Sequence, residues 1–167
     1  EDAATGNLDG DWGTVGWECG RMAGDWINEH YPDEEIEFAT MGIRGDETSN
    51  ARSDGLIGGV LEKAPNAKHV YEILATSAMG FTAETGMRQV EDIMQKHPNV
   101  KVIVSFGAYG GVGGNQALKA ILDPEDYDSF GLFSTDASEE ECVSIQRHEV
   151  LKGSLSLGGG RWHGRML

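Results

Sequence analysis

The stretch that decides the fold is VIVSFGAYGGVGGNQALKAI, residues 102–121. It begins with β-branched, apolar residues typical of a buried strand. Further on, apolar residues spaced three and four apart predict a helix over 114–122. We predict that the glycine run 110–114 between them forms the turn from strand to helix. Glycines at such a turn allow a ligand or another backbone segment to approach the main chain closely.

The glycine run matches neither of the common phosphate-binding motifs. A dinucleotide fingerprint needs Gly-x-Gly-x-x-Gly, and counting from Gly111 the last glycine is replaced by Gln116. A phosphate loop needs Gly-Lys-Ser/Thr, but the first lysine after the run is Lys119, inside the predicted helix. Two interpretations remain open: a turn that lines a ligand site at the carboxyl edge of a parallel sheet, or a turn needed only for tight helix–sheet packing.

Composition limits the classes of protein to consider. The chain has 167 residues, of which 39% are hydrophobic, so we expect one domain with its own core. A formal net charge of -15 and a pI near 4.5 argue against a nucleic-acid or anionic-membrane partner, because either would need a concentrated basic face. The two cysteines, Cys19 and Cys142, are too few for a disulfide framework, and we expect both to be buried or half-buried.

Apolar runs and helical patterns alternate along the whole chain. We predict strands at 36–43, 69–76, 100–107, 129–136 and 154–158. We predict helices at 15–31, 49–63, 82–97, 114–122 and 138–151. Strands of near-continuous apolar character joined by helices belong to a parallel sheet covered on both faces. The expected fold class is therefore α/β, a three-layer α/β/α domain with a parallel, doubly wound sheet.

No motif for catalysis or metal binding is complete. Ser138 followed by three glutamates is typical of a helix start. The hydroxyl caps the helix, and the carboxylates interact favourably with the positive end of its dipole. The segment 7–18 imitates a calcium loop, but its sixth position, which needs glycine, is Trp12. We therefore expect no enzyme activity, no metal and no cofactor.

Four side chains or turns at the ends of predicted strands form the informative set. They are Arg52, Phe81, the Tyr109–Gly110 turn and Asp136. Because the carboxyl ends of parallel strands share one edge of the sheet, these residues are expected to converge on one cleft. Three of them also have a plain structural explanation: Arg52 as a solvated helix residue, Phe81 as a core residue, and Asp136 as the cap of the helix beginning near Ser138.

The order and spacing of several segments resemble those of the type I periplasmic binding proteins, in particular the ribose-binding-protein-like sugar receptors of ABC transporters. The matching segments are GRMAGDWI (20–27), the run 42–55 that ends in Asp-Gly, HPNVKVIVSFGA (97–108) and GLFSTDASEEECVSI (131–145). The resemblance covers nearly the whole chain but only the carboxyl-terminal lobe of such a receptor. It implies a lead-in and hinge segment at 1–13, the ligand-binding lobe at 14–157, and a hinge exit and tail at 158–167.

The resemblance also implies roles for the convergent residues. Arg52 matches the arginine that hydrogen-bonds sugar hydroxyls, Phe81 the aromatic ring that stacks on the sugar, and Asp136 the carboxylate that accepts from neighbouring hydroxyls. Where relatives present Asn-Asp after the third strand, this chain has Tyr109 and Gly110, so Tyr109 is expected to supply a replacement contact beside a backbone-lined wall.

The implied function is the sugar-binding component of an ABC transporter. Its implied partners are a small-molecule sugar, the transporter permease and the missing amino-terminal lobe of the same receptor. The implied location is the periplasm or, as a lipoprotein, the cell surface. Two alternatives remain: the effector-binding domain of a lac-repressor-like transcription regulator, which shares the fold, and a flavodoxin-like enzyme, which the missing phosphate motifs disfavour.

Overall fold

The computed structural model describes residues 12–156 and contains one five-stranded, all-parallel sheet in the order β2-β1-β3-β4-β5. The elements are α1 (Trp12–His30), β1 (Glu37–Gly42), α2 (Glu47–Lys63), β2 (Lys68–Leu74), α3 (Ala83–Lys96), β3 (Val100–Ser105), α4 (Ala108–Ile121), the 3₁₀ helix η1 (Pro124–Ser129), β4 (Gly131–Thr135), α5 (Glu139–Gln146) and β5 (Leu151–Leu155). This architecture confirms the predicted fold class.

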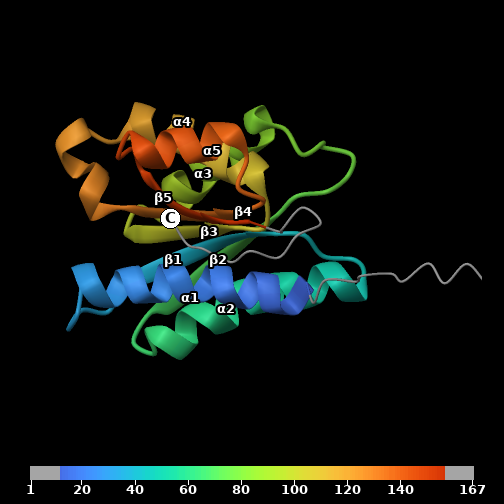
Figure 1. Ribbon diagram of the computed structural model, residues 1–167, viewed down its shortest axis with the longest axis horizontal. Coiled ribbons are helices and arrows are strands. Elements are labelled where there is room, and N and C mark those ends of the chain that lie inside the picture. The colour runs from blue at the N-terminus through green and yellow to red at the C-terminus, as the bar shows by residue number, and fades with distance from the viewer. Residues whose placement is uncertain (1–11, 157–167) are drawn as a thin grey trace, which may run out of the picture.

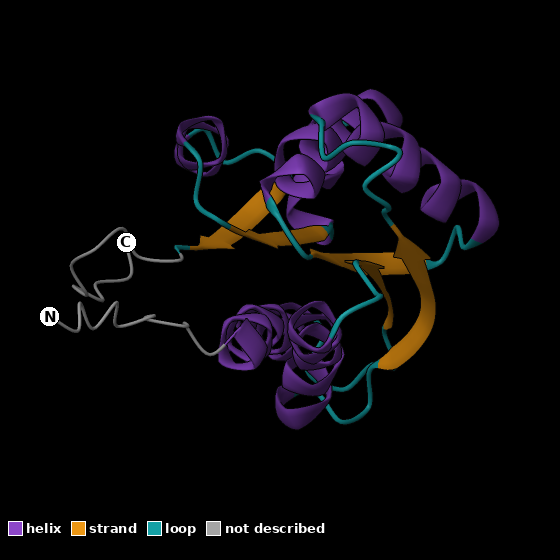
Figure 2. Cartoon of the chain, turned by 90° about the vertical axis from the view of Figure 1, so that its right-hand side faces the viewer, coloured by secondary structure: helices purple, strands orange, loops and turns teal. Residues whose placement is uncertain are grey.

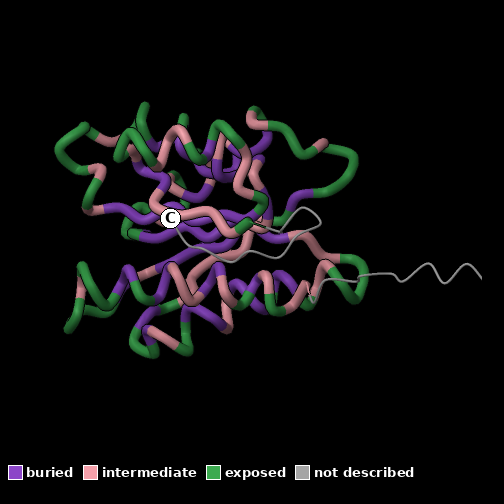
Figure 3. The backbone as a smooth tube through the Cα atoms, viewed as in Figure 1, coloured by how far each residue is buried: buried purple, intermediate pink, exposed green. Residues whose placement is uncertain are grey.

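Helices cover both faces of the sheet. Helices α1 and α2 lie against one face, and α3, α4 and α5 lie against the other (Figures 1 and 2). Successive residues of a strand point to opposite faces, so Phe38 packs in the α1–α2 core whereas Ala39 and Met41 pack in the α3–α4 core. The buried positions follow the strands and the inward sides of the helices (Figure 3). Two apolar cores thus hold the sheet between them.

Side-chain caps fix where three of the helices begin at the carboxyl edge of the sheet. Asp46 accepts a hydrogen bond from the Ser49 amide at the start of α2, and Thr82 accepts one from the Thr85 amide at the start of α3. Ser138 and Glu141 form a reciprocal capping box at the start of α5. The first-turn glutamate that completes this box is buried, so it has a structural role.

The end of the described chain departs from the prediction. The helix expected over 138–151 ends at Gln146, and the strand expected at 154–158 is β5, Leu151–Leu155. The reason is a turn at His148, whose φ of 55° is incompatible with a continued right-handed helix. Leu151 then pairs with Leu132 of β4 and is fully buried, which fixes the start of the strand.

The glycine run is helical, so the prediction of a turn over 110–114 was wrong. Helix α4 begins at Ala108, immediately after Gly107, and includes all four glycines of the run. A Cβ at Gly113 would lie 2.0 Å from the Ala83 carbonyl oxygen of α3, and one at Gly111 would meet the buried Glu141 carboxylate. The glycines are therefore required for close packing, which is the second of the two interpretations drawn from the sequence.

Cys19 is buried as predicted, but Cys142 is exposed on α5, so that part of the prediction was wrong. Across residues 12–156, no helix combines the length and apolar character needed to cross a membrane. The expected lead-in segment up to residue 11, including most of the calcium-like segment, and the hinge exit and tail from 157 onward lie outside the described residues.

Candidate functional site

The predicted site residues come from four different connections at the carboxyl edge. Arg52 lies in the second turn of α2, Phe81 lies just before α3, Tyr109 is in the first turn of α4, and Asp136 directly follows β4. Arg52 and Asp136 contact each other, and so do the rings of Phe81 and Tyr109. The fold therefore joins two pairs of predicted residues that are far apart in the sequence.

Arg52 and Asp136 form an ion pair that is buried on one side only. The distance from Nη2 of Arg52 to Oδ1 of Asp136 is 2.9 Å, and the exposed side-chain fractions are 6% for the arginine and 38% for the aspartate. The arginine charge is thus removed from water and balanced by one carboxylate, which still faces solvent. Groups in this arrangement are able to offer a carboxylate oxygen to a ligand hydroxyl.

Two aromatic rings and a hydroxyl surround the Arg52 guanidinium. Its Cζ atom lies 4.3 Å from the ring centroid of Phe106 and 5.3 Å from that of Trp12. Nη2 also donates to the hydroxyl of Thr135, which in turn donates to the Phe106 carbonyl. The guanidinium is held in one place before any ligand arrives.

Sequence reasoning did not assign roles to Thr135, Phe106 or Trp12. The first two do carry a sequence signal, because each occupies the last position of a strand or the residue after it, next to a predicted contact. Trp12 carries no such signal, since its position over Arg52 depends on the packing of α1 against α2.

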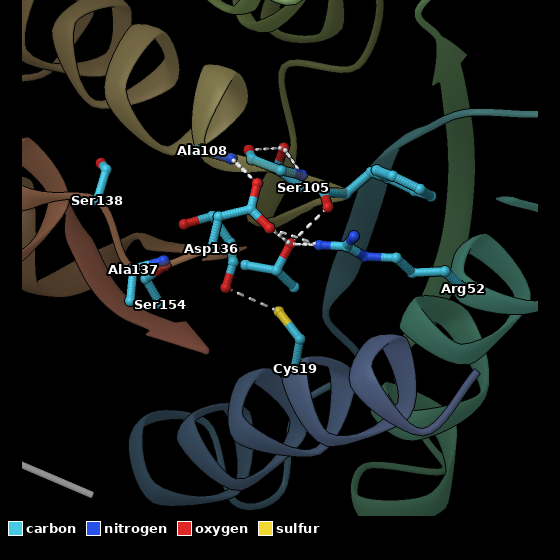
Figure 4. A network of polar contacts seen from close by, with 12 residues as sticks. Cys19, Arg52, Ser105, Ala108, Asp136, Ala137, Ser138 and Ser154 are labelled. Atoms are coloured by element: carbon cyan, nitrogen blue, oxygen red, sulfur yellow. Dashed lines mark hydrogen bonds and ion pairs between the residues drawn. The ribbon is translucent and has the colours of Figure 1, made fainter. Parts of the chain in front are cut away.

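Asp136 connects the two helical layers. Its Oδ2 accepts a hydrogen bond of 3.2 Å from the Ala108 amide at the start of α4, whose N-cap, Gly107, has no side chain to do so (Figure 4). Its Oδ1 accepts from Arg52 of α2. The carboxylate therefore caps α4, and the helix that begins after Ser138 is capped by Ser138 itself. The structural alternative drawn from the sequence named the wrong helix.

Two buried polar atoms at this edge lack partners among the described residues. They are Nε of Arg52 and the hydroxyl oxygen of Tyr109. Burial raises the pKa of the Tyr109 hydroxyl, while the nearby Ser105 hydroxyl acts in the opposite direction. Unsatisfied buried donors are costly, and a water molecule or a ligand hydroxyl would satisfy them.

Phe81 lies on the surface, where half of it is exposed. Its ring centroid is 5.6 Å from that of Tyr109, at an interplanar angle of 46°. The structural alternative of a buried core residue is therefore wrong for Phe81. An exposed ring supported from below by a second ring is suited to covering an apolar face of a ligand.

The structure places Gly110 inside the molecule. A Cβ there would meet the Ser105 hydroxyl oxygen at 2.0 Å, so this residue packs α4 onto the end of β3. Tyr109 is also largely buried, at 8% exposure. A backbone-lined wall at these positions is not what the fold forms, although the Tyr109 side chain does reach the edge beside Phe81.

Other polar features of the described surface are separate from this edge cluster. Arg44 is paired with Asp54 at 2.6 Å and with Glu72 at 2.9 Å, so its guanidinium is already occupied. A hollow of about 470 Å³ lies between α4 and α5, lined by residues such as Asn115, Lys119 and Arg147, and includes none of the predicted site residues. Within residues 12–156, no cluster of three or more His, Cys, Asp or Glu side chains is arranged to hold a metal ion.

Comparison with solved structures identifies the same fold in several proteins whose structures contain a bound sugar. A Mycobacterium smegmatis protein in complex with β-D-fucofuranose has 18% identity and a TM-score of 0.70, with 84% of this chain and 44% of that chain covered. The periplasmic binding protein component of the arabinose ABC transporter from Shewanella sp. ANA-3 has 19% identity and a TM-score of 0.69, with 89% and 46% covered. An ABC transporter periplasmic solute-binding protein from Actinobacillus succinogenes 130z, with bound D-allose, has 15% identity and a TM-score of 0.67, with 82% and 44% covered.

The chain thus spans about half or less of the length of these structures. No curated protein matches it in sequence. The family model described as periplasmic binding protein domain matches residues 6–155, which is most of the chain. This chain belongs to the periplasmic binding protein domain family.

Proposed function

We propose that the chain is the carboxyl-terminal lobe of an extracytoplasmic sugar receptor that serves an ABC transporter. The ligand is a monosaccharide or a related small polar molecule, bound at the carboxyl edge of the sheet. The observation that carries the proposal is the half-exposed carboxylate of Asp136, held by the buried Arg52, at the same edge as the exposed ring of Phe81. Family membership and the bound sugars named for the solved structures support it.

Each predicted residue has a role that its chemistry suits. Asp136 accepts a hydrogen bond from a sugar hydroxyl, and Arg52 donates to a neighbouring one, because charge-assisted bonds to vicinal hydroxyls are strong and directional. Phe81 covers the C–H face of the ring. Tyr109 supplies its unpaired hydroxyl, and Gly110 keeps α4 close enough to β3 for Tyr109 to reach this edge.

Binding of this kind is a receptor function without catalysis, and it requires no cofactor. The partners are the sugar, the transporter permease and a second lobe supplied by residues of the same polypeptide outside the matched region. The lobe that contains residues 12–156 is the unit that closes on the ligand. The location is the periplasm or the cell surface.

The test is calorimetric titration of a sugar panel against the chain and against a longer form extended upstream of Glu1. In the longer form, Asp136→Ala and Arg52→Ala are each expected to cost about 2–4 kcal/mol of binding free energy, because each leaves a charged partner and a sugar hydroxyl unpaired. Phe81→Ala is expected to weaken cyclic sugars more than open-chain polyols.

The matched control is Met79→Ala, which removes another exposed apolar side chain from the same loop as Phe81. It is expected to leave binding unchanged. Unchanged affinity in both Asp136→Ala and Arg52→Ala would contradict the proposal, and so would an equal loss for cyclic sugars and open-chain polyols in Phe81→Ala.

A further inference from the structure

Two consecutive residues that are not glycine have a left-handed backbone at the end of β4. The φ angles are 94° for Asp136 and 48° for Ala137. Among residues 12–156, the one other such residue is His148, at 55°. This conformation is unfavourable for side chains other than glycine, and least so for aspartate and asparagine, so it persists only where the surroundings enforce it.

Hydrogen bonds enforce the conformation at three successive amides. The Asp136 amide donates to the Leu155 carbonyl at 2.8 Å, and the Ala137 amide donates to the Ser154 hydroxyl at 3.0 Å. The Ser138 amide donates to the buried Glu141 carboxylate at 2.7 Å. The turn is thus fixed between β5 and α5, and Figure 4 shows Ala137 beside Ser154 of β5.

The left-handed turn redirects the Asp136 side chain. Along β4, Ser134 bonds to Glu141 in the α5 layer, and Thr135 bonds to Arg52 in the α2 layer. If the strand continued, Asp136 would point into the α5 layer again. It instead contacts both Arg52 on one side and the Ala108 amide on the other, which holds the carboxylate across the edge of the sheet.

We propose that the left-handed Asp136–Ala137 turn holds the carboxylate in its ligand-binding orientation, and that Ala137 is a positioning residue of the sugar site. The proposal rests on the proposed function for its ligand, but its geometry can be tested without one. Alanine at a left-handed position costs stability that glycine would recover. Glycine would also allow other backbone conformations at this turn, from which the carboxylate would lose its fixed place.

The test compares Ala137→Gly with His148→Gly in the 167-residue chain. Both replace a left-handed residue by glycine, but His148 lies in the turn before β5, where its amide donates to the Ile145 carbonyl. The measurements are the melting temperature, hydrogen exchange of the Ala108 amide by NMR, and titration with L-arabinose and D-allose. Both variants are expected to melt at the same temperature as the parent or about 2 °C higher.

The Ala108 amide is expected to exchange about fivefold faster in Ala137→Gly alone, because its acceptor is no longer held in place. Sugar affinity is expected to fall about fivefold in that variant alone. Parent-like exchange in Ala137→Gly, or equally faster exchange in both variants, would overturn the positioning role. Faster exchange in Ala137→Gly, together with sugar-induced changes that lie away from residues 107–109 and 135–138 in every form, would support the positioning role and contradict the proposed function.

Discussion

The seam between α3 and α4 and the carboxyl edge of the sheet are built in opposite ways. In the seam, helix backbones touch directly: a Cβ at Gly86 would lie 2.0 Å from the Tyr109 carbonyl oxygen, and one at Gly113 would lie equally close to the Ala83 carbonyl oxygen. At the edge, Arg52 and Tyr109 have buried polar atoms without partners, and Asp136 has a left-handed backbone.

This difference sets a closely packed frame beside an edge that holds unsatisfied polar groups and a strained backbone. Of the three residues in the described range with unpartnered buried side-chain atoms, two lie at the edge, and the third, Gln89, lies on α3. Strain and unsatisfied polar groups tend to gather at functional sites, whereas the frame around them is closely packed. The seam between α1 and α2 supports the same view, because Gly16 packs directly on the backbone of Arg52.

The largest expected effect comes from filling the seam. Gly113→Ala places a methyl group against backbone atoms of α3 that cannot move aside, so it is expected to lower the free energy of unfolding by about 3 kcal/mol. Gly153→Ala is the control, since its Cβ would be 3.3 Å from the Phe133 ring, and it is expected to cost less than about 1 kcal/mol. Urea denaturation measures the free energy of unfolding of both variants. Equal losses would show that α3 and α4 do not pack more closely than the surroundings of Gly153.

A smaller effect is expected from breaking the ion pair at the edge. Asp136→Ala leaves the buried Arg52 charge without its carboxylate and is expected to cost about 2 kcal/mol, less than for a fully buried pair because the aspartate is partly exposed. Adding Arg52→Leu removes the charge that Asp136→Ala leaves unpaired. The double variant is therefore expected to lose less free energy of unfolding than the sum of the two single variants. Strict additivity in urea denaturation would contradict the coupling of these residues.

The smallest effect concerns His69 on β2, the edge strand at the other end of the sheet from β5. Its ring nitrogen is 3.0 Å from the Thr40 hydroxyl, and burial lowers its pKa below the usual 6.5. The unfolded chain then binds the proton first, so stability is retained above about pH 6.5 and falls as the pH decreases through the folded pKa. His69→Gln is expected to flatten this part of the melting-temperature profile, and an unchanged profile would contradict it.

Much of the fold could be predicted from the sequence because its signals are local. Apolar periodicity is enough to place β1, β3, α2 and α3, and the Ser138 cap is visible as a hydroxyl before three glutamates. The pairing of Arg52 with Asp136 was expected only as convergence on one edge, which follows from parallel strands.

The misplaced features depend on contacts between distant residues. A glycine run after a strand suits either a turn or a tightly packed helix, and the choice is made by the backbone of Ala83 on another helix. The start of β5 depends on the left-handed turn at His148, for which histidine gives only a weak signal. Propensity alone does not contain these interactions.

The measurement that tests the central claim most directly is an NMR titration of the isotope-labelled 167-residue chain with L-arabinose and D-allose, followed amide by amide. The account predicts shifts concentrated at residues 107–109 and 135–138, with a dissociation constant no tighter than roughly 1 mM, since one lobe makes only part of the contacts. Micromolar binding would show that the site is complete in this chain, and shifts centred on the hollow between α4 and α5 would show that the carboxyl edge is not the site.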